Sequence, residues 1–385
     1  MMAAGVIGVA CMPPATAPSP GKTGAGGTTA GGGGSTATTP SGSGGTTSAG
    51  STGGSAGASN GGSVGTAGSG GAMMTGSGGM TANTGGATGA PSSDAGGDGS
   101  PDGEPAGPGW GGVPGVRDMS PVNATAGCGS EPGQALGSWV MSRVVITPKP
   151  VRGTGNREYY IKLPANYDNK KPYRLIFVAP GCTGKGNNMF DFTNAAGTEG
   201  VIQIGLNPEP GVWLQECFDD KKTDSIEYQF LETLLDLASK KLCFDQNRVF
   251  ITGHSSGGWL SNQMGCTYGS KLIRAIAPSS GGLATGVGVE PRCTELPTPG
   301  IWSHNENDNP AGSERAIARA LKVNRCQGTF ADSPRAPWMG EANCQQFTTC
   351  PKEFPIVYCH PPTGGHLGNL GPQPARSWKF FKALP

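Results

Sequence analysis

Residues 248–258 read Arg-Val-Phe-Ile-Thr-Gly-His-Ser-Ser-Gly-Gly, and this stretch decides the fold of the chain. Its apolar start predicts a strand, and the run that follows, residues 259–264, is suited to a helix. Between the two lies Gly-x-Ser-x-Gly, with Ser255 at its centre. A serine on so sharp a turn has strained backbone angles, so Gly253 and Gly257 must lack bulk. We therefore expect Ser255 to be a nucleophile; the alternative is an ordinary glycine-rich turn.

Apolar runs of strand length recur on both sides of this stretch. They lie at residues 157–163, 174–179, 201–204, 275–277 and 356–358. Apolar residues at helical spacing lie between or after them, at residues 224–241, 313–323 and 375–384. The continuous run at 174–179 is typical of a strand that is covered on both faces. Strands that alternate with helices predict an α/β fold with a doubly wound, mostly parallel sheet.

A serine nucleophile needs a base, and we expect His366 to supply it. Where a nucleophilic serine sits on such a turn, the acid and then the histidine follow it in the chain. His366 stands in a glycine loop, residues 363–368, that can bring an imidazole back over the strand ends. The alternative is His360, at the end of the preceding strand, which could equally be a partly buried structural histidine.

The orienting acid is predicted in the loop after a short strand at residues 300–303. Asp308 lies a few residues beyond that strand and is the favoured acid. Glu306 and Asp332 are the alternatives, and for any of them a solvated loop carboxylate is the competing explanation. The acid would hold the imidazole of the base in its productive orientation.

Two backbone N–H groups should form the oxyanion hole. One is predicted at Ser256, the residue after the nucleophile. The other is predicted in the loop of residues 179–184, directly after the apolar strand, where we assign it to Cys182 with Thr183 as the alternative. If these assignments are wrong, the loop is a flexible surface segment.

The N-terminal third of the chain has a different composition. The chain has 385 residues with 68 Gly and 33 Pro, and most of that excess lies in residues 12–116, which predict a disordered linker. Residues 1–11 end in an apolar run and Cys11, which resembles the end of a bacterial lipoprotein signal, although no Lys or Arg precedes the run. Residues 120–385 are expected to form the globular domain.

The 11 cysteines indicate an oxidising compartment. One lipidated Cys11 and up to five disulfides among the ten cysteines from Cys128 to Cys359 would account for all of them. Cys344 and Cys350 are the first pair we expect, since a short polar stretch separates them. The cysteines lack paired C-x-x-C spacing with histidines, so neither a metal nor another cofactor is expected.

The charge pattern limits the partners. The formal net charge is +1 and no basic cluster stands out, so no nucleic-acid partner is expected. No apolar run reaches the ~18 residues of a membrane-spanning helix. We expect a monomer that is secreted or held at the bacterial cell surface, with a possible lipid anchor at Cys11.

Short motifs between residues 127 and 366 carry a family resemblance. They lie at residues 127–129, 163–168, 172–177, 242–245, 248–258, 274–277, 324–326, 344, 350 and 364–366. Together they resemble the secreted feruloyl esterases and the related polyhydroxybutyrate-depolymerase-like carbohydrate esterases. The resemblance implies an α/β-hydrolase fold, metal-free ester hydrolysis and a triad of Ser255, Asp308 and His366.

The chain departs from that family at two places. Pro180-Gly181 stands where the family has His-Gly at the oxyanion loop, and Asn305 replaces the glycine of its His-Gly-x-x-Asp motif around the acid. The function we expect is an exported serine carboxylic-ester hydrolase that releases hydroxycinnamates from plant cell-wall polysaccharide. A polyhydroxyalkanoate depolymerase or an acetylxylan esterase is the close alternative. A non-catalytic, surface-tethered binding protein is the alternative from another class. Trp213, Trp259 and Trp302 are candidates for the pocket walls.

Overall fold

The computed structural model describes residues 110–147, 155–208, 226–283 and 293–385. The predicted signal segment and nearly all of the predicted linker lie outside the described residues, as do Cys11, Trp213 and the predicted helix start at Asp224. Within the described residues, no helix is long and apolar enough to cross a membrane.

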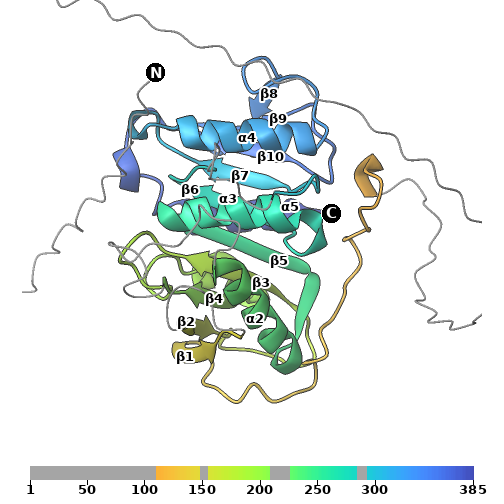
Figure 1. Ribbon diagram of the computed structural model, residues 1–385, viewed down its shortest axis with the longest axis vertical. Coiled ribbons are helices and arrows are strands. Elements are labelled where there is room, and N and C mark those ends of the chain that lie inside the picture. Colours follow the sequence, from red (N-terminus) through yellow and green to blue (C-terminus); the bar gives the residue numbers. More distant parts are fainter. Residues whose placement is uncertain (1–109, 148–154, 209–225, 284–292) are drawn as a thin grey trace, which may run out of the picture. The chain divides into compact units, whose positions relative to one another are not determined.

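The strands of the described residues form one sheet in the order β1-β2-β4-β3-β5-β6-β7-β10-β9-β8 (Figure 1). From β4 to β10 the neighbouring strands are parallel, and the two strands at either edge pair antiparallel. Their bounds are β1 Trp139–Val145, β2 Asn156–Lys162, β3 Tyr173–Ala179, β4 Ile202–Leu206, β5 Phe244–His254, β6 Ala275–Ser279, β7 Gly300–Ser303, β8 Arg335–Pro337, β9 Cys344–Phe347 and β10 Ile356–Cys359.

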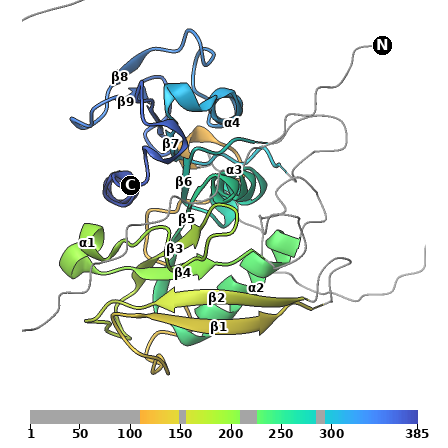
Figure 2. The ribbon, with the colours of Figure 1, turned by 90° about the vertical axis from the view of Figure 1, so that its left-hand side faces the viewer.

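Helices cover both faces of this sheet, as Figure 2 shows. One face carries α2 (Ile226–Lys241), α3 (Ser256–Tyr268) and α4 (Ala311–Val323), and the other carries α1 (Thr193–Ala196) and α5 (Gln373–Ala383). In β3, Leu175 and Phe177 belong to the first core, whereas Ile176 and Val178 belong to the second. Burial on both faces explains why the run has no polar alternation. The predicted doubly wound α/β-hydrolase fold is therefore confirmed.

Disulfides join elements that are distant in the sequence. The described pairs are Cys128–Cys243, Cys266–Cys293, Cys326–Cys350 and Cys344–Cys359, and Cys182 is also disulfide-bonded. The predicted pair Cys344–Cys350 is therefore wrong. Cys344 lies directly opposite Cys359 in the β9–β10 register, while Cys350 lies beside Cys326, just after α4. Strand pairing decides the bridge here, and closeness in the sequence does not.

The segment just before the predicted domain packs on it. Trp110 meets the ring of Phe354 edge-on, with a centroid distance of 5.3 Å, and Val113 and Val116 are buried in the same cluster. The guanidinium of Arg274 lies 4.4 Å above the Trp110 ring. Residues 110–116 were predicted as linker, and the structure corrects this. They contain too few apolar side chains to indicate a core in the sequence, but these side chains pack against Phe354.

Candidate active site

The turn between β5 and α3 has the geometry that its sequence predicts. Ser255 has φ 53° and ψ −118°, a conformation that L-residues rarely adopt, and α3 begins at the next residue. A Cβ on Gly253 would lie 2.3 Å from the carbonyl oxygen of Gly257, and a Cβ on Gly257 would lie 2.1 Å from that of Ala179. Only glycine fits at these two positions, so the turn can hold the Ser255 side chain clear of the sheet.

The predicted acid and base meet although 58 positions separate them in the sequence. Asp308 ends a short 3-10 turn, Glu306–Asp308, after β7, and His366 lies in another, Gly365–Leu367, after β10. The His366 Nδ1 lies 3.0 Å and 2.9 Å from the two carboxylate oxygens of Asp308. Since β7 and β10 are parallel neighbours, their carboxyl ends lie side by side and bring these loops together.

Asparagine side chains join these two loops. The amide of Asn305 donates to the carbonyl of Gly365, and the side-chain oxygen of Asn305 accepts from the amide of Asn369 at 2.8 Å. The backbone N–H of Gly365 donates to the side-chain oxygen of Asn307, also at 2.8 Å. Asn305, which stands where the family that the sequence resembles has a glycine, connects the acid loop to the histidine loop through its side chain.

Two further histidines, His254 and His304, lie beside the Asp308–His366 pair, and the sequence predicted a role for neither. The His254 ring lies 4.7 Å from the His366 ring, centroid to centroid, and the His304 Nε2 lies 3.1 Å from a carboxylate oxygen of Asp308. His254 stands inside the Gly-x-Ser-x-Gly motif, and His304 stands four positions before the acid. In the sequence, the position of each histidine next to Ser255 or near Asp308 is the feature that could have identified them. His360, the alternative base, instead stacks on Tyr358 with a centroid distance of 4.8 Å.

Burial and hydrogen bonding shift the pKa values of the ionisable groups of the site in opposite directions. Burial alone would raise the pKa of Asp308, but hydrogen bonds from His304 and His366 outweigh it and hold that pKa well below its usual range. Burial, followed by the nearby His366, lowers the pKa of His254 to about 3. At neutral pH the site therefore contains an ionised Asp308 and an uncharged His254.

The loop after β3 approaches the serine turn. A Cβ built on Gly181 would lie 3.3 Å from the Ser255 Cβ, and the Gly184 N–H donates to the Gly181 carbonyl at 3.0 Å, which closes the loop. Cys182 is half-buried in this loop, and Thr183 is exposed with φ 63°. Ser256 is the first residue of α3, so its N–H has no acceptor within the helix. Both predicted oxyanion donors thus lie on segments that flank Ser255.

Among the described residues, the side chain of Ser255 makes no hydrogen bond to its predicted base, His366, although the Ser280 hydroxyl donates to the His366 carbonyl at 3.1 Å. Catalytic hydrogen bonds often become short only when substrate binds. The His366 side chain is 46 % exposed, so a substrate can reach it.

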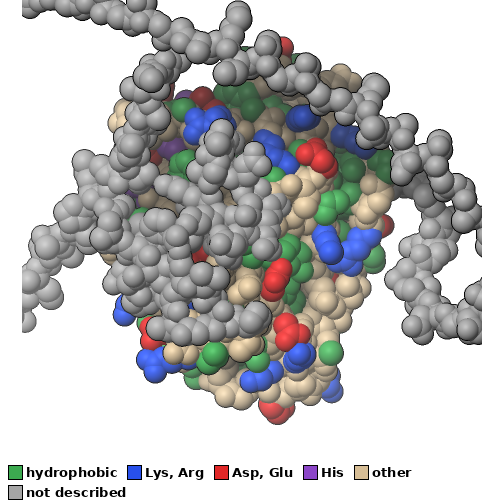
Figure 3. Space-filling model, in the orientation of Figure 1, with side chains coloured by type: hydrophobic (Ala, Val, Ile, Leu, Met, Phe, Trp, Pro, Cys, Tyr) green, Lys and Arg blue, Asp and Glu red, His purple; other side chains and the backbone are tan. Residues whose placement is uncertain are grey.

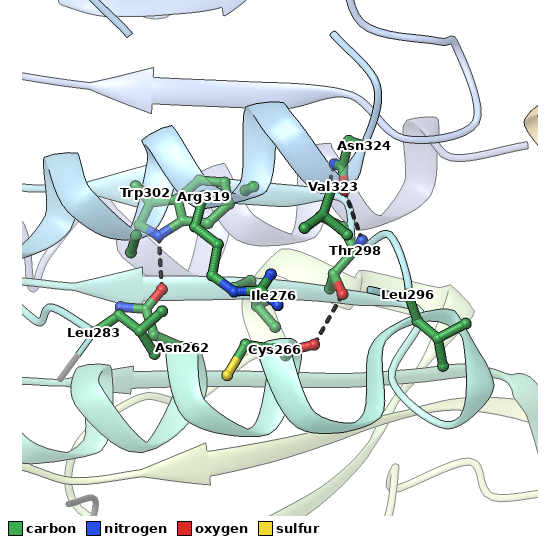
Figure 4. Close-up of a pocket in the computed structure, with 13 residues that line it drawn as sticks. Asn262, Cys266, Ile276, Leu283, Leu296, Thr298, Trp302, Arg319, Val323 and Asn324 are labelled. Carbon is green, nitrogen blue, oxygen red and sulfur yellow. Dashed lines mark hydrogen bonds between the residues drawn. The ribbon is translucent and has the colours of Figure 1, made fainter. Parts of the chain in front are cut away.

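A cavity between α3 and α4 lies apart from this site (Figure 4). Its volume of about 20 Å³ suffices for roughly one water molecule. Trp302 lines it, is 1 % exposed and donates to the Asn262 side chain at 2.7 Å. The prediction that Trp302 forms a substrate-pocket wall is therefore wrong, because its ring is part of the core. Trp259 is half-buried, in the first turn of α3.

Charged side chains are mixed on the described surface that Figure 3 shows, where lysines and arginines are interspersed with acidic residues. This distribution accords with the formal net charge of +1.

A comparison with models of known protein families found no match. The curated feruloyl esterase C of Emericella nidulans is 28% identical over 288 residues, which cover 69% of this chain and 94% of that protein. Feruloyl esterase D of Neurospora crassa is 26% identical over 300 residues, which cover 70% of this chain and 92% of that protein. The solved acetyl xylan esterase from Aspergillus awamori is 16% identical with a TM-score of 0.49, over 63% of this chain and 99% of that chain. The chain is thus similar to curated feruloyl esterases over nearly their whole length.

Proposed function

We propose that this chain is a serine ester hydrolase that cleaves feruloyl esters, with Ser255, Asp308 and His366 as its catalytic triad. The observation that carries the proposal is the Asp308–His366 pair at the carboxyl ends of β7 and β10, on the same sheet edge as the Ser255 turn. The names of the curated relatives support the substrate class.

The proposed reaction begins with attack of the Ser255 hydroxyl on the ester carbonyl carbon. The His366 Nδ1 faces Asp308, which leaves Nε2 to take the serine proton and then to give it to the departing alcohol. Asp308 stays ionised and stabilises the imidazolium that forms. In this proposal the N–H groups of Ser256 and Cys182 stabilise the oxyanion, and water then hydrolyses the acyl-enzyme.

The finer proposal concerns the natural substrate and the place of action. We infer that the ester is a hydroxycinnamate on plant cell-wall polysaccharide, with acetylated xylan or a polyhydroxyalkanoate as the alternative. The disulfides support action outside the reducing cytosol, since such bonds persist in oxidising compartments. Lipidation at Cys11 stays a prediction from the sequence, because Cys11 lies outside the described residues.

A substrate panel tests the proposal. The purified chain is assayed on methyl ferulate, acetylated xylan and short-chain polyhydroxybutyrate, and methyl ferulate should give the highest kcat/KM. In Ser255→Ala the rate should fall by about 10³-fold or more with the melting temperature nearly unchanged. The matched control, Ser138→Ala, changes an exposed serine and should keep full activity.

Each outcome of the panel has a defined meaning. Preference for acetylated xylan or polyhydroxybutyrate would replace the substrate class but keep the triad. Normal turnover by Ser255→Ala would refute the nucleophile. Folded protein that hydrolyses none of the three esters would contradict ester hydrolysis and favour the non-catalytic binding protein.

A further inference from the structure

The carboxylate of Asp308 lies between two imidazoles. On one side His366 approaches it through Nδ1 at 2.9 Å. On the other side the His304 Nε2 lies 3.1 Å from Oδ2 of Asp308 and 2.8 Å from its backbone carbonyl oxygen. The His304 side chain is only 6 % exposed, compared with 46 % for His366, so the second imidazole is an internal one.

The other nitrogen of the His304 ring is also held. Its Nδ1 lies 2.6 Å from the hydroxyl of Ser313 in α4, and that hydroxyl contacts the carbonyl of Gly281, just after β6. Ser313 is 2 % exposed. The ring of His304 is therefore fixed at both nitrogens, by the acid loop on one side and by α4 on the other.

The partners of Nε2 settle which way its hydrogen bond runs. Both are oxygens of Asp308, and neither a carbonyl nor an ionised carboxylate can donate. Nε2 therefore carries a proton and donates it, whichever arrangement the Ser313 hydroxyl adopts. A hydrogen bond to the charged form of a carboxylate stabilises that form, which agrees with the low pKa of Asp308.

We propose that His304 is a positioning residue for the acid of the triad: its Nε2–H fixes the Asp308 carboxylate against His366 and shares its negative charge. The inference rests on the proposed triad and adds to it a residue whose side-chain hydrogen bonds, within the described chain, go to Asp308 and Ser313. His304 thus acts on the reaction through Asp308 alone.

Two effects follow if the donor is removed. A carboxylate held on one side only can rotate, and a displacement of about 1 Å in an active site can cost on the order of 100-fold in rate. The freed carboxylate would also stabilise the imidazolium of His366 more strongly, so the acid limb of the pH profile of kcat/KM should move to higher pH. The titratable groups that face the His366–Asp308 pair are His254 from β5 and His304 itself.

Three substitutions of His304 separate the two sides of the ring. The Gln amide nitrogen in His304→Gln can occupy the place of Nε2 and keep the donor to Asp308. The shorter His304→Asn can replace Nδ1 and keep only the contact with Ser313. His304→Met has similar bulk and keeps neither. As a matched control, His360→Met changes a half-buried histidine that stacks on Tyr358.

The expected result is that kcat falls about tenfold to a hundredfold in the Met and Asn variants, with KM unchanged and the acid limb shifted up. The Gln variant and the His360→Met control should stay close to the wild type. Equal behaviour of all three His304 variants, or rescue by Asn and not by Gln, would overturn the proposal in favour of a merely structural tie to Ser313.

A measurement without turnover keeps this inference separate from the proposed function. The chain has four histidines, so their ring signals can be assigned by nitrogen-15 NMR. The ring nitrogen-15 signals of His366 should change in the Met variant and not in the Gln variant, even if no ester proves to be a substrate. In the wild type, an unprotonated Nε2 on His304 at neutral pH would refute the proposal whether or not the variants fold.

Discussion

At the scale of single residues, a pair of histidine rings beside the proposed nucleophile differs sharply in environment. His254 is 3 % exposed and its ring nitrogens have no hydrogen-bond partner among the described residues. Burial and the nearby His366 lower the pKa of His254 to about 3, so this ring stays neutral at working pH. A neutral neighbour at 4.7 Å lets His366 take up a proton without facing a second positive charge.

The pKa of His254 predicts how stability should depend on pH. The ordinary pKa of histidine is 6.5, and in the folded chain that of His254 is about 3. Between these values the unfolded chain binds a proton that the folded chain excludes. The unfolding free energy contributed by this site therefore falls as pH drops, by up to about 1.4 kcal/mol per pH unit.

His254→Phe removes this titration while keeping an aromatic ring. The variant should lose less stability than the wild type between neutral pH and about pH 4.5, as measured by urea unfolding at both values. The two proteins differ only at this position, so the difference between them reports on His254 and its contacts with the neighbouring groups. Parallel losses of stability would mean that His254 is already protonated in the folded chain or is not buried.

At the scale of helices and strands, the elements predicted from the sequence have two buried faces, an alternating pattern as in β2, or a clear helical stripe. β3 and β5 carry continuous apolar runs because cores cover both of their faces. β1, β8 and β9 were missed, and all three lie at or near the sheet edges: β1 is apolar but exposes Met141 and Val145, and β8 has only three residues. The short β8 and β9 lack the continuous apolar run on which the prediction depends, whereas the apolar residues of β1 were not recognised as a strand.

The same limit applies to the candidate site. The order of serine, acid and histidine can be read along the chain, and the Asp308–His366 contact agrees with it. The roles of His254 and His304 depend on contacts between β5, α4 and the loops after β7 and β10, and no local pattern encodes those contacts.

The disulfide between β9 and β10 is a direct test of the strand register. Peptide mapping of the unreduced protein should find Cys344 joined to Cys359 and Cys350 joined to Cys326. A Cys344–Cys350 peptide would contradict the register in which Cys344 faces Cys359. Removing the Cys344–Cys359 bridge by a double alanine substitution should lower the unfolding free energy by about 2–4 kcal/mol, mainly by freeing the unfolded chain.

At the scale of the whole molecule, the domain extends further toward the N-terminus than its composition indicates. Val113, Val116 and Met119 are each at most 5 % exposed, and the Arg325 side chain donates to the Gly112 carbonyl at 2.8 Å. This short segment connects to Phe354, near β10, and to Arg274, just before β6.

Two truncations should therefore behave differently. A chain that begins at residue 103 should keep the stability and turnover of the full chain, since the deleted residues have the composition of a linker. A chain that begins at residue 120 exposes the surface that three buried side chains covered and should lose about 2–5 kcal/mol of unfolding free energy. Equal melting temperatures for the two chains would show that the segment contributes nothing to folding.

The order of the strands along the chain also determines when each part of the proposed site is synthesised. β5 and its serine turn leave the ribosome well before β10, and the proposed base follows β10. About 110 residues separate Ser255 from His366, which at ~5–20 residues per second is a delay on the order of ten seconds. During that interval a nascent chain carries the proposed nucleophile without its proposed base. With the proposed triad, an ester hydrolase assembled in this order gains its base only after its last parallel strand has been made.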